Sequence, residues 1–466
     1  IENERKDIPL PCNILSNRKN SKGIDISEMD NLDAIRTQIS KYKNQSVDAV
    51  SIYHNRTDKG AKNHDAVSIA DGTYIGTVLF DDPSLVKKSL ESNTNLNWSK
   101  ASANKRAEIL IAISNNLESN PYQLIYYLMH EAGKTIQNAI DEIREAVDFL
   151  RYYANQMIDI TEKEGVLDGP TGEENILSYS AKGHIICISP WNFPVAILIG
   201  QISAALITGN KVTVKPSEHT SILGYLVTNI FHKHGVPIDV LELLLGDGHH
   251  GDELSKLNNI NGVAFTGSLK TAKKIQTNLN ESQKEILPLI AETGGINAMI
   301  VDSSALLEQA TDDIVRSAFD SAGQRCSALR VLCIQDDIYH DLLKMIKGNM
   351  QELKIGNPEE LDTDIGPIIN KSAKDKLEEY IKNKAKAGFE VFQANSELME
   401  QHISPTIIEI NALNDIDEEQ FGPILHVLKF KSSDIDNLIQ NINNTGYGLT
   451  MGIHTRIESR ADLFSQ

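Results

Sequence analysis

Short apolar runs alternate with longer mixed stretches between residues 183 and 300. The apolar runs predict four strands, at 184–188, 210–215, 240–245 and 262–265. The intervening stretches predict helices at 194–208, 220–234 and 268–280. Strands that alternate with helices form parallel sheets with helices packed on their faces. A predicted helix at 310–322 and strand at 328–334 continue the alternation to about residue 430, so the sequence predicts an α/β fold.

The chain before residue 183 has a different pattern. Residues 100–156 are strongly helical, and an apolar stripe recurs there in steps of four and three. The stripe consists of Ile136, Ile140, Ile143, Val147, Leu150 and Ala154. Glycine and proline punctuate residues 163–182, which predicts a turn-rich hairpin. Residues 1–60 are polar and broken, so we expect an extended lead-in with a short helix near 29–42.

One uncharged stretch, residues 185–210, is long enough to cross a bilayer. Pro190, Asn192 and Pro194 interrupt it, however. These breakers favour a buried strand, a loop and a buried helix over a membrane span. We therefore expect no transmembrane segment.

Composition narrows the class of protein. Apolar residues make up 41% of the chain and charged residues 23%, which is typical of globular proteins. With 64 acidic and 45 basic residues the net charge is −19, which argues against a nucleic-acid surface. The four cysteines, none in a CxxC pair, favour a reducing compartment, the cytoplasm, and no metal site. The start of the chain has no apolar signal core and reads like the beginning of a fragment.

Three motifs at predicted strand ends suit a nucleotide. Residues 246–251 form a GxGxxG, but no acidic residue follows between 254 and 280, so a simple turn remains an alternative. Lys215 and Glu218 end the second strand, where they could bind ribose hydroxyls or form a solvated loop pair. Gly267 and Ser268 suit a phosphate at a helix N-terminus, or Ser268 caps that helix.

Three further residues are candidates for catalytic roles, as a nucleophile, a general base and an oxyanion donor. Cys326 follows Arg325 in the run GQRCS, and a neighbouring cation with a helix N-terminus would favour its reactive thiolate. The alternative is an inert core cysteine, and no histidine pattern accompanies it, which argues against a papain-like hydrolase. Glu292, before two glycines, is a candidate general base for a water. Asn192 could donate its amide N–H to an oxyanion.

The runs SPWNFP, VKPSE, FTGS, ETGG, GQRCS and EEQFGP occur in the order typical of the aldehyde dehydrogenase superfamily, across nearly the whole chain. The chain resembles that superfamily. The segments KDIPLPCNIL, INAMIVDSSA and SAFDSAGQRCSALR are similar to the L-glutamate γ-semialdehyde (Δ1-pyrroline-5-carboxylate) dehydrogenase half of bacterial bifunctional proline utilization A proteins. The resemblance implies an aldehyde-dehydrogenase-like fold. That fold has a Rossmann-type NAD-binding domain, an α/β catalytic domain and a small β-hairpin used in oligomerisation.

The resemblance also implies a reaction, the NAD-dependent oxidation of L-glutamate γ-semialdehyde to L-glutamate in proline catabolism. Cys326 would be the nucleophile, Glu292 the base for thioester hydrolysis, and Asn192 an oxyanion donor. The implied NAD-binding residues are Ser189, Trp191, Lys215, Glu218, Gly246, Gly267, Ser268, Glu419 and Phe421. Glu218 would favour NAD over NADP by repelling a 2′-phosphate. The implied substrate-binding residues are Glu145, Phe193, Arg325 and Ser327; Glu145 taken alone would be a solvated helix residue.

The resemblance predicts a lead-in at 1–60, an NAD-binding domain at 61–291 interrupted by the hairpin at about 160–182, and a catalytic domain at 292–466. Relatives continue beyond the position of Gln466 with a substrate-anchoring loop and an oligomerisation strand, so we expect an excised piece of a larger chain. The implied partners in the parent are a proline dehydrogenase domain and a second copy. The alternatives are another aldehyde dehydrogenase, an acyl transfer to coenzyme A, which Glu292 opposes, or an inactive fragment that only binds NAD.

Overall fold

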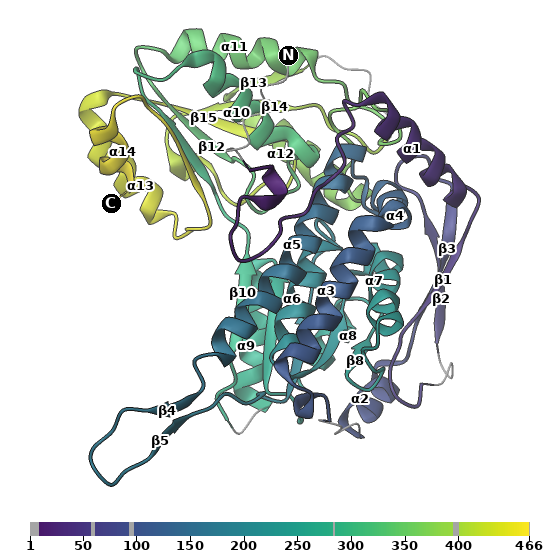
Figure 1. Cartoon of the computed structure of the whole chain (residues 1–466). Coiled ribbons are helices and arrows are strands. Elements are labelled where there is room, and N and C mark those ends of the chain that lie inside the picture. The colour runs from purple at the N-terminus through teal and green to yellow at the C-terminus, as the bar shows by residue number, and fades with distance from the viewer. Residues whose placement is uncertain (1–8, 57–60, 93–96, 283–284, 395–399, 466) are drawn as a thin grey trace, which may run out of the picture. The chain divides into compact units, whose positions relative to one another are not determined.

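The computed structural model describes residues 9–56, 61–92, 97–282, 285–394 and 400–465 (Figure 1). The chain forms two compact units. Unit 1 comprises Ile1–Ser68, Gly72–Ala132 and Gln137–Glu292. Unit 2 comprises Ile69–Asp71, Gly133–Ile136 and Thr293–Gln466.

A five-stranded sheet forms the centre of unit 1, in the order β10-β9-β6-β7-β8. Its strands are β6 (His184–Ile188), β7 (Lys211–Lys215), β8 (Leu241–Leu243), β9 (Gly262–Gly267) and β10 (Leu289–Thr293). β6 pairs in parallel with β7 and with β9, and β7 pairs in parallel with β8. Ile188 lies opposite both Lys215 and Phe265, so the carboxyl ends of three strands meet at one edge of the sheet.

Helices pack against this sheet and against one another. α6 (Ala196–Ile207) contacts β6 and β7, α7 (Ser221–Lys233) contacts β8, and α9 (Leu269–Ser282) contacts β9. α6 carries no charged residue and is almost entirely buried, which a helix between a sheet and a further helix layer requires. That layer includes α3 (Ala103–Ser119), which contacts α6, and α4 (Tyr122–Ala132), which contacts α7. α5 (Ile136–Thr161) buries the predicted apolar stripe completely.

The remaining elements of unit 1 include a three-stranded sheet, a hairpin and short helices. The small sheet has the order β1-β3-β2, from β1 (Val47–Val50), β2 (Lys62–Val67) and β3 (Tyr74–Phe80). The predicted hairpin consists of β4 (Gly165–Leu167) and β5 (Asn175–Leu177), and Figure 1 shows it projecting beyond the end of α5. The other helices are α1 (Met29–Ile39), α2 (Pro83–Ser92) and α8 (Gly248–Leu254).

Unit 2 is built on a six-stranded sheet in the order β13-β14-β15-β12-β11-β16. Its strands are β11 (Ala298–Val301), β12 (Val331–Gln335), β13 (Glu390–Gln393), β14 (Thr406–Ile410), β15 (Ile424–Phe430) and β16 (Met451–His454). Only β13 runs antiparallel among the described pairs. Its helices are α10 (Leu307–Phe319), α11 (Tyr339–Glu352), α12 (Lys371–Lys386), α13 (Ile435–Asn444) and α14 (Glu458–Ser465). The sheet and helices enclose a continuous apolar core.

The prediction at 310–334 was partly wrong. α10 ends at Phe319, and Ser321, Ala322 and Gly323 then adopt left-handed backbone angles, so the predicted helix cannot reach residue 322. β12 begins at Val331 rather than at residue 328. Across the residues that the structure describes, no helix is both long enough and apolar enough to span a membrane.

Candidate functional site

The nucleotide motifs of unit 1 lie on loops that leave the carboxyl ends of neighbouring strands. The loop after β6 begins with Ser189, whose N–H donates to the carbonyl of Lys215 over 3.1 Å. Gly267 ends β9, the neighbour of β6 on the other side. The fold therefore brings the loop after β6, Lys215 and Gly267, which are far apart in sequence, to one edge of the sheet, the position where α/β sheets bind ligands.

Lys215 is a buried cation beside a carboxylate. Its side chain is 5% exposed, and its Nζ donates to the carbonyl of Pro216 over 3.1 Å and lies 4.0 Å from Glu218 Oε2. Burial lowers the pKa of Lys215, while the charges of Glu218 and Asp247 oppose that shift. The Glu218 side chain is 40% exposed. A fixed donor next to an accessible acceptor fits the two hydroxyls of a ribose.

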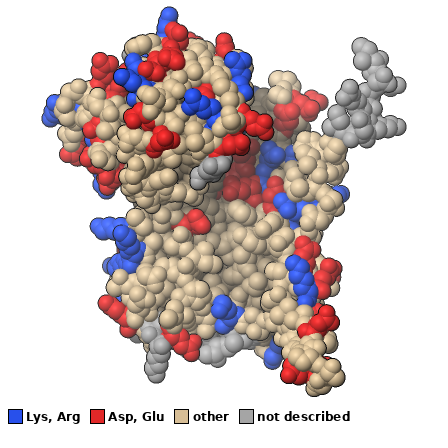
Figure 2. All heavy atoms as spheres, turned by 90° about the vertical axis from the view of Figure 1, so that its left-hand side faces the viewer, with Lys and Arg blue, Asp and Glu red and all other residues tan. Residues whose placement is uncertain are grey.

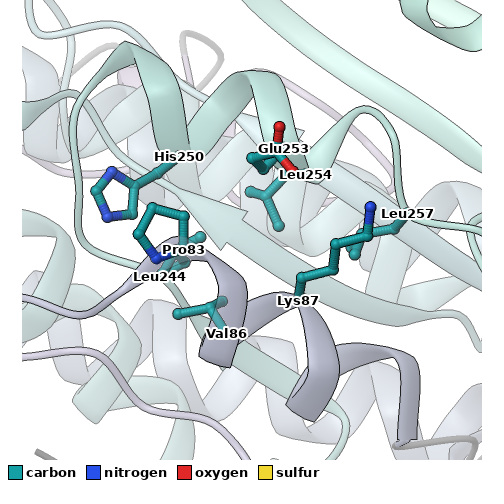
Figure 3. Close-up of a pocket in the computed structure, with 8 residues that line it drawn as sticks. All are labelled: Pro83, Val86, Lys87, Leu244, His250, Glu253, Leu254 and Leu257. Carbon is teal, nitrogen blue, oxygen red and sulfur yellow. The ribbon is translucent and has the colours of Figure 1, made fainter. Parts of the chain in front are cut away.

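Gly246 has a structural role that the sequence did not reveal. A Cβ at Gly246 would lie 2.2 Å from the His250 ring, whose Nε2 donates to the Asp81 carbonyl (2.8 Å) and whose Nδ1 lies 2.9 Å from Asp247 Oδ1. Asp247 caps α8 by accepting the N–H of His250 and of the preceding residue. Figure 3 shows the His250 ring beside Pro83, in a small pocket between α2 and α8. Gly246 thus makes room for an imidazole that links α8 to Asp81, two residues before α2.

Ser268 acts as a helix cap. Its Oγ accepts the N–H of Thr271 over 3.2 Å and lies 2.9 Å from Thr271 Oγ1, directly before α9. The capping alternative is therefore confirmed for Ser268. Contact with a cofactor phosphate stays a prediction for Ser268 and Gly267.

The loop between β6 and α6 carries Asn192, which is buried. Glu142 on α5 holds the end of this loop, because its Oε1 accepts the backbone N–H of Val195 (2.8 Å) and of Ala196 (3.3 Å). Trp191 and Phe193, on either side of Asn192, are half-buried. Glu145 lies three residues beyond Glu142 on α5 and is exposed. Sequence reasoning singled out Glu145 and missed Glu142, although both lie on the same predicted helix.

Glu292 lies on the edge strand β10 and is exposed, as a base that must reach a water requires.

The predicted nucleophile lies in unit 2, on residues 320–328, which we call the Cys326 loop. Cys326 is half-buried and follows a short 3-10 helix, Asp320–Gly323. The predicted helix N-terminus at Cys326 was wrong, because the loop leads into β12 instead. Asn297 supports the loop, since its Nδ2 donates to the carbonyls of Cys326 (2.7 Å) and Ala328 (2.9 Å). An asparagine two residues after paired glycines carried no signal that pointed to this role.

Arg325 is paired within its own loop. Its guanidinium lies 2.8 Å from Asp320 Oδ2, and its Nε donates to Ser321 Oγ over 3.1 Å. Asp320 therefore offsets part of the positive potential expected from Arg325. Ser327 is exposed beside it.

The last predicted cofactor residues lie on residues 418–423 of unit 2, which we call the Phe421 loop. Glu419 Oε1 lies 3.3 Å from an amino group of Arg330, whose guanidinium carbon is 5.3 Å from the centre of the Phe421 ring. Burial raises the pKa of Glu419, and Arg330 opposes that shift. A Cβ at Gly294 would lie 1.8 Å from Glu419 Oε2, so the ETGG glycine admits this carboxylate.

The strand-end Lys–Glu pair at a parallel sheet edge in unit 1, and the half-buried cysteine on a glycine-containing loop in unit 2, place the chain in the class of α/β proteins with a ligand site at the strand ends. The chain belongs to the aldehyde dehydrogenase family, whose model matches residues 56–466.

The chain is similar to curated proteins of two names. The chain is 41% identical to the bifunctional protein PutA of Escherichia coli (strain K12), over 97% of this chain and 34% of that protein. It is 32% identical to the 1-pyrroline-5-carboxylate dehydrogenase of Staphylococcus epidermidis, over 94% of this chain and 86% of that protein. The chain thus spans about a third of the length of the PutA relatives that it matches.

Solved structures with the same two names share the fold. A crystal structure of bifunctional proline utilization A superposes with a TM-score of 0.88 at 37% identity, covering 99% of this chain and 44% of that one. A point mutant of Thermus thermophilus 1-pyrroline-5-carboxylate dehydrogenase gives a TM-score of 0.91 at 26% identity, covering 97% of this chain and 89% of that one. The predicted aldehyde-dehydrogenase-like fold is confirmed.

Proposed function

We propose that this chain oxidises L-glutamate γ-semialdehyde, the open form of Δ1-pyrroline-5-carboxylate, to L-glutamate with NAD. The observation that carries the proposal is 41% identity to a PutA protein over 97% of the chain, joined to relatives named for pyrroline-carboxylate dehydrogenation. The strand-end Lys215–Glu218 pair and the accessible Cys326 support it.

The residues that would hold NAD fall into two groups. Lys215 and Glu218 would bind the adenosine ribose, and Ser189, Trp191, Gly246, Gly267 and Ser268 belong to the loops at the same sheet edge. Glu419 would bind the nicotinamide ribose and Phe421 would pack on the nicotinamide. When bound, NAD supplies the acceptor for the hydride that leaves the substrate carbon. Residues 61–291 would form the NAD-binding domain and residues 292–466 the catalytic domain.

Cys326, as thiolate, adds to the aldehyde carbon and converts the carbonyl oxygen to an oxyanion. The Asn192 amide and the Cys326 backbone N–H donate to that oxyanion, and each such donor typically contributes about 2.7–4 kcal/mol. Loss of the hydride leaves an acyl thioester on Cys326. Glu292 takes a proton from water, the hydroxide attacks the thioester, and the carboxylate product leaves as the thiolate is restored.

The substrate is a zwitterion, so its recognition needs both signs of charge. Glu145 would bind the ammonium, Phe193 would pack on the aliphatic part, and Ser327 with Arg325 would face the carboxylate. The proposal includes a cytoplasmic location. In the parent protein, the partners would be a proline dehydrogenase domain and a second copy of the chain. On the face in Figure 2, acidic and basic side chains are interspersed, in keeping with a small-molecule substrate rather than nucleic acid.

The test is NADH formation at 340 nm with pyrroline-5-carboxylate. Wild type should turn over, Cys326→Ala should not, and Cys12→Ala should match wild type, because Cys12 lies in a short N-terminal 3-10 helix. A panel of other aldehydes, with and without coenzyme A, distinguishes related dehydrogenases and acyl transfer. Faster turnover of an unrelated aldehyde, or turnover that survives in Cys326→Ala, would overturn the proposal.

A further inference from the structure

A single buried guanidinium ties the Cys326 loop to the Phe421 loop. Arg330 precedes β12 and its side chain is 1% exposed. It donates to the carbonyls of Gly323 (2.7 Å) and Arg325 (2.8 Å) in the Cys326 loop. It also donates to the Gly422 carbonyl (3.2 Å) and to Glu419 Oε1 (3.3 Å) in the Phe421 loop.

The Cys326 loop needs such support because its backbone is strained. Ser321, Ala322 and Gly323 are three consecutive left-handed residues, with φ of 55°, 54° and 64°. Only glycine adopts this conformation freely, so the surrounding structure must hold the other two. The carbonyl that ends the turn, on Gly323, is the one that Arg330 binds most closely.

The two loops also touch directly. A Cβ at Gly323 would lie 2.2 Å from the Gly422 carbonyl oxygen, so the backbones are in close contact. The guanidinium carbon of Arg330 is 5.3 Å from the Phe421 ring centre, within cation–π range. His426 Nδ1 donates to the backbone carbonyl of Arg330 over 3.0 Å, which adds a further contact to this residue.

We propose that Arg330 is a positioning residue that sets the Cys326 thiol and the nicotinamide-side residues Glu419 and Phe421 in one fixed arrangement. It acts through the two loops. The inference rests on the proposed function, which supplies the roles of Cys326, Glu419 and Phe421. A planar five-donor fork is required, because a lysine offers one nitrogen and cannot reach four acceptors in two loops.

The test compares Arg330→Lys with Arg456→Lys, both in a Cys12→Ala background that leaves Cys326 as the accessible thiol. Arg456 is an apt control, since its guanidinium also donates to a backbone carbonyl of unit 2, that of Ser304, outside both loops. The two readouts are the rate of Cys326 alkylation by iodoacetamide and the Kd of NAD from calorimetry. Neither readout needs the aldehyde. A wrong substrate assignment would therefore appear separately, as absence of NADH formation by the Cys12→Ala protein.

Arg330→Lys should slow alkylation and weaken NAD binding by about tenfold each, and Arg456→Lys should change neither by more than about twofold. If the Cys12→Ala protein is active, Arg330→Lys should both lower kcat and raise the KM for NAD. If Arg330→Lys folds and its alkylation rate and Kd of NAD both equal those of the Cys12→Ala protein, the inference is overturned. If Arg330→Lys does not fold, Gly323→Ala is the second variant, because it leaves Arg330 in place and forces the two loops apart. It must weaken NAD binding, although Gly323 lies in the Cys326 loop and not in the Phe421 loop. Unchanged NAD affinity in Gly323→Ala would equally overturn the inference.

Discussion

Glu142 accepts the backbone N–H of Val195 over 2.8 Å, although 53 residues separate the two in sequence. Val195 precedes α6, and its amide is one of the donors that a helix leaves unpaired at its N-terminus. The Glu142 side chain is fully buried. A carboxylate on α5 therefore fixes the entry to α6 and, through it, the loop that carries Asn192.

Glu142→Ala should reduce kcat by about 10- to 100-fold, because a displaced Asn192 loses part of its value as an oxyanion donor. It should also lower the free energy of unfolding by about 1–3 kcal/mol, since the Val195 and Ala196 amides lose a charged acceptor. Steady-state kinetics and urea denaturation measure the two effects.

Glu142→Gln is the matched variant, because the amide oxygen of glutamine still accepts an N–H. It should recover most of kcat and part of the stability. Equal kcat in Glu142→Ala and wild type would show that the Asn192 loop holds its position without this cap.

A second buried glutamate should give unit 1 a pH dependence. Glu131 on α4 accepts the N–H of Ile222 (2.8 Å) and Leu223 (2.9 Å) at the start of α7. Burial raises the pKa of Glu131 to about 8, against the opposing effect of these two hydrogen bonds. Between its unfolded pKa and about 8, the folded chain holds a proton that the unfolded chain has lost. The contribution of Glu131 to the free energy of unfolding is complete at low pH. It declines by about 1.4 kcal/mol per pH unit as the pH rises through this window.

Urea denaturation of wild type and Glu131→Gln from about pH 5 to pH 8 measures this contribution. Glutamine does not titrate, so the wild-type free energy of unfolding should fall relative to that of the variant as the pH rises. Parallel profiles would mean that Glu131 is ionised throughout the range.

Periodicity was sufficient to locate most elements around the nucleotide motifs. β6 and α7 lie within one residue of the predicted ranges, because apolar runs of that length bounded by turn residues permit few alternatives. The left-handed turn at Ser321–Gly323 was not predictable, since serine and alanine give no local signal for such angles. Tertiary contacts with Arg330 and Gly422 determine it.

Buried polar contacts were equally hidden. Lys211 and Glu242 form an ion pair of 2.9 Å with side chains 1% and 0% exposed, yet the sequence shows only two charges in apolar strands. Resemblance supplied the residues that are proposed to face the substrate or cofactor. It did not identify Arg330, Glu142 or Asn297, because their partners are backbone atoms of distant segments and leave no local pattern.

Glu218 should determine the choice between NAD and NADP. Its carboxylate is partly exposed beside Lys215 at the end of β7, where it would repel a 2′-phosphate. Glu218→Gln should raise kcat/KM for NADP by about 10- to 100-fold and lower that for NAD by about tenfold. Glu281→Gln on α9 removes the same charge elsewhere in unit 1 and should leave both values unchanged. An unaltered NADP/NAD ratio in Glu218→Gln would place the discriminating contact on another residue.

Glu292 should be needed after hydride loss but not before it. Glu292→Gln keeps the size of the side chain and removes its basicity, so the thioester on Cys326 should form normally and hydrolyse slowly. Rapid mixing at 340 nm should then show a burst of about one NADH per chain, followed by turnover reduced by about 10²-fold or more. Glu285→Gln, an exposed glutamate seven residues earlier, should behave as wild type. If the burst itself slows as much as the turnover, Glu292 deprotonates the thiol before attack, and a different group must activate the water.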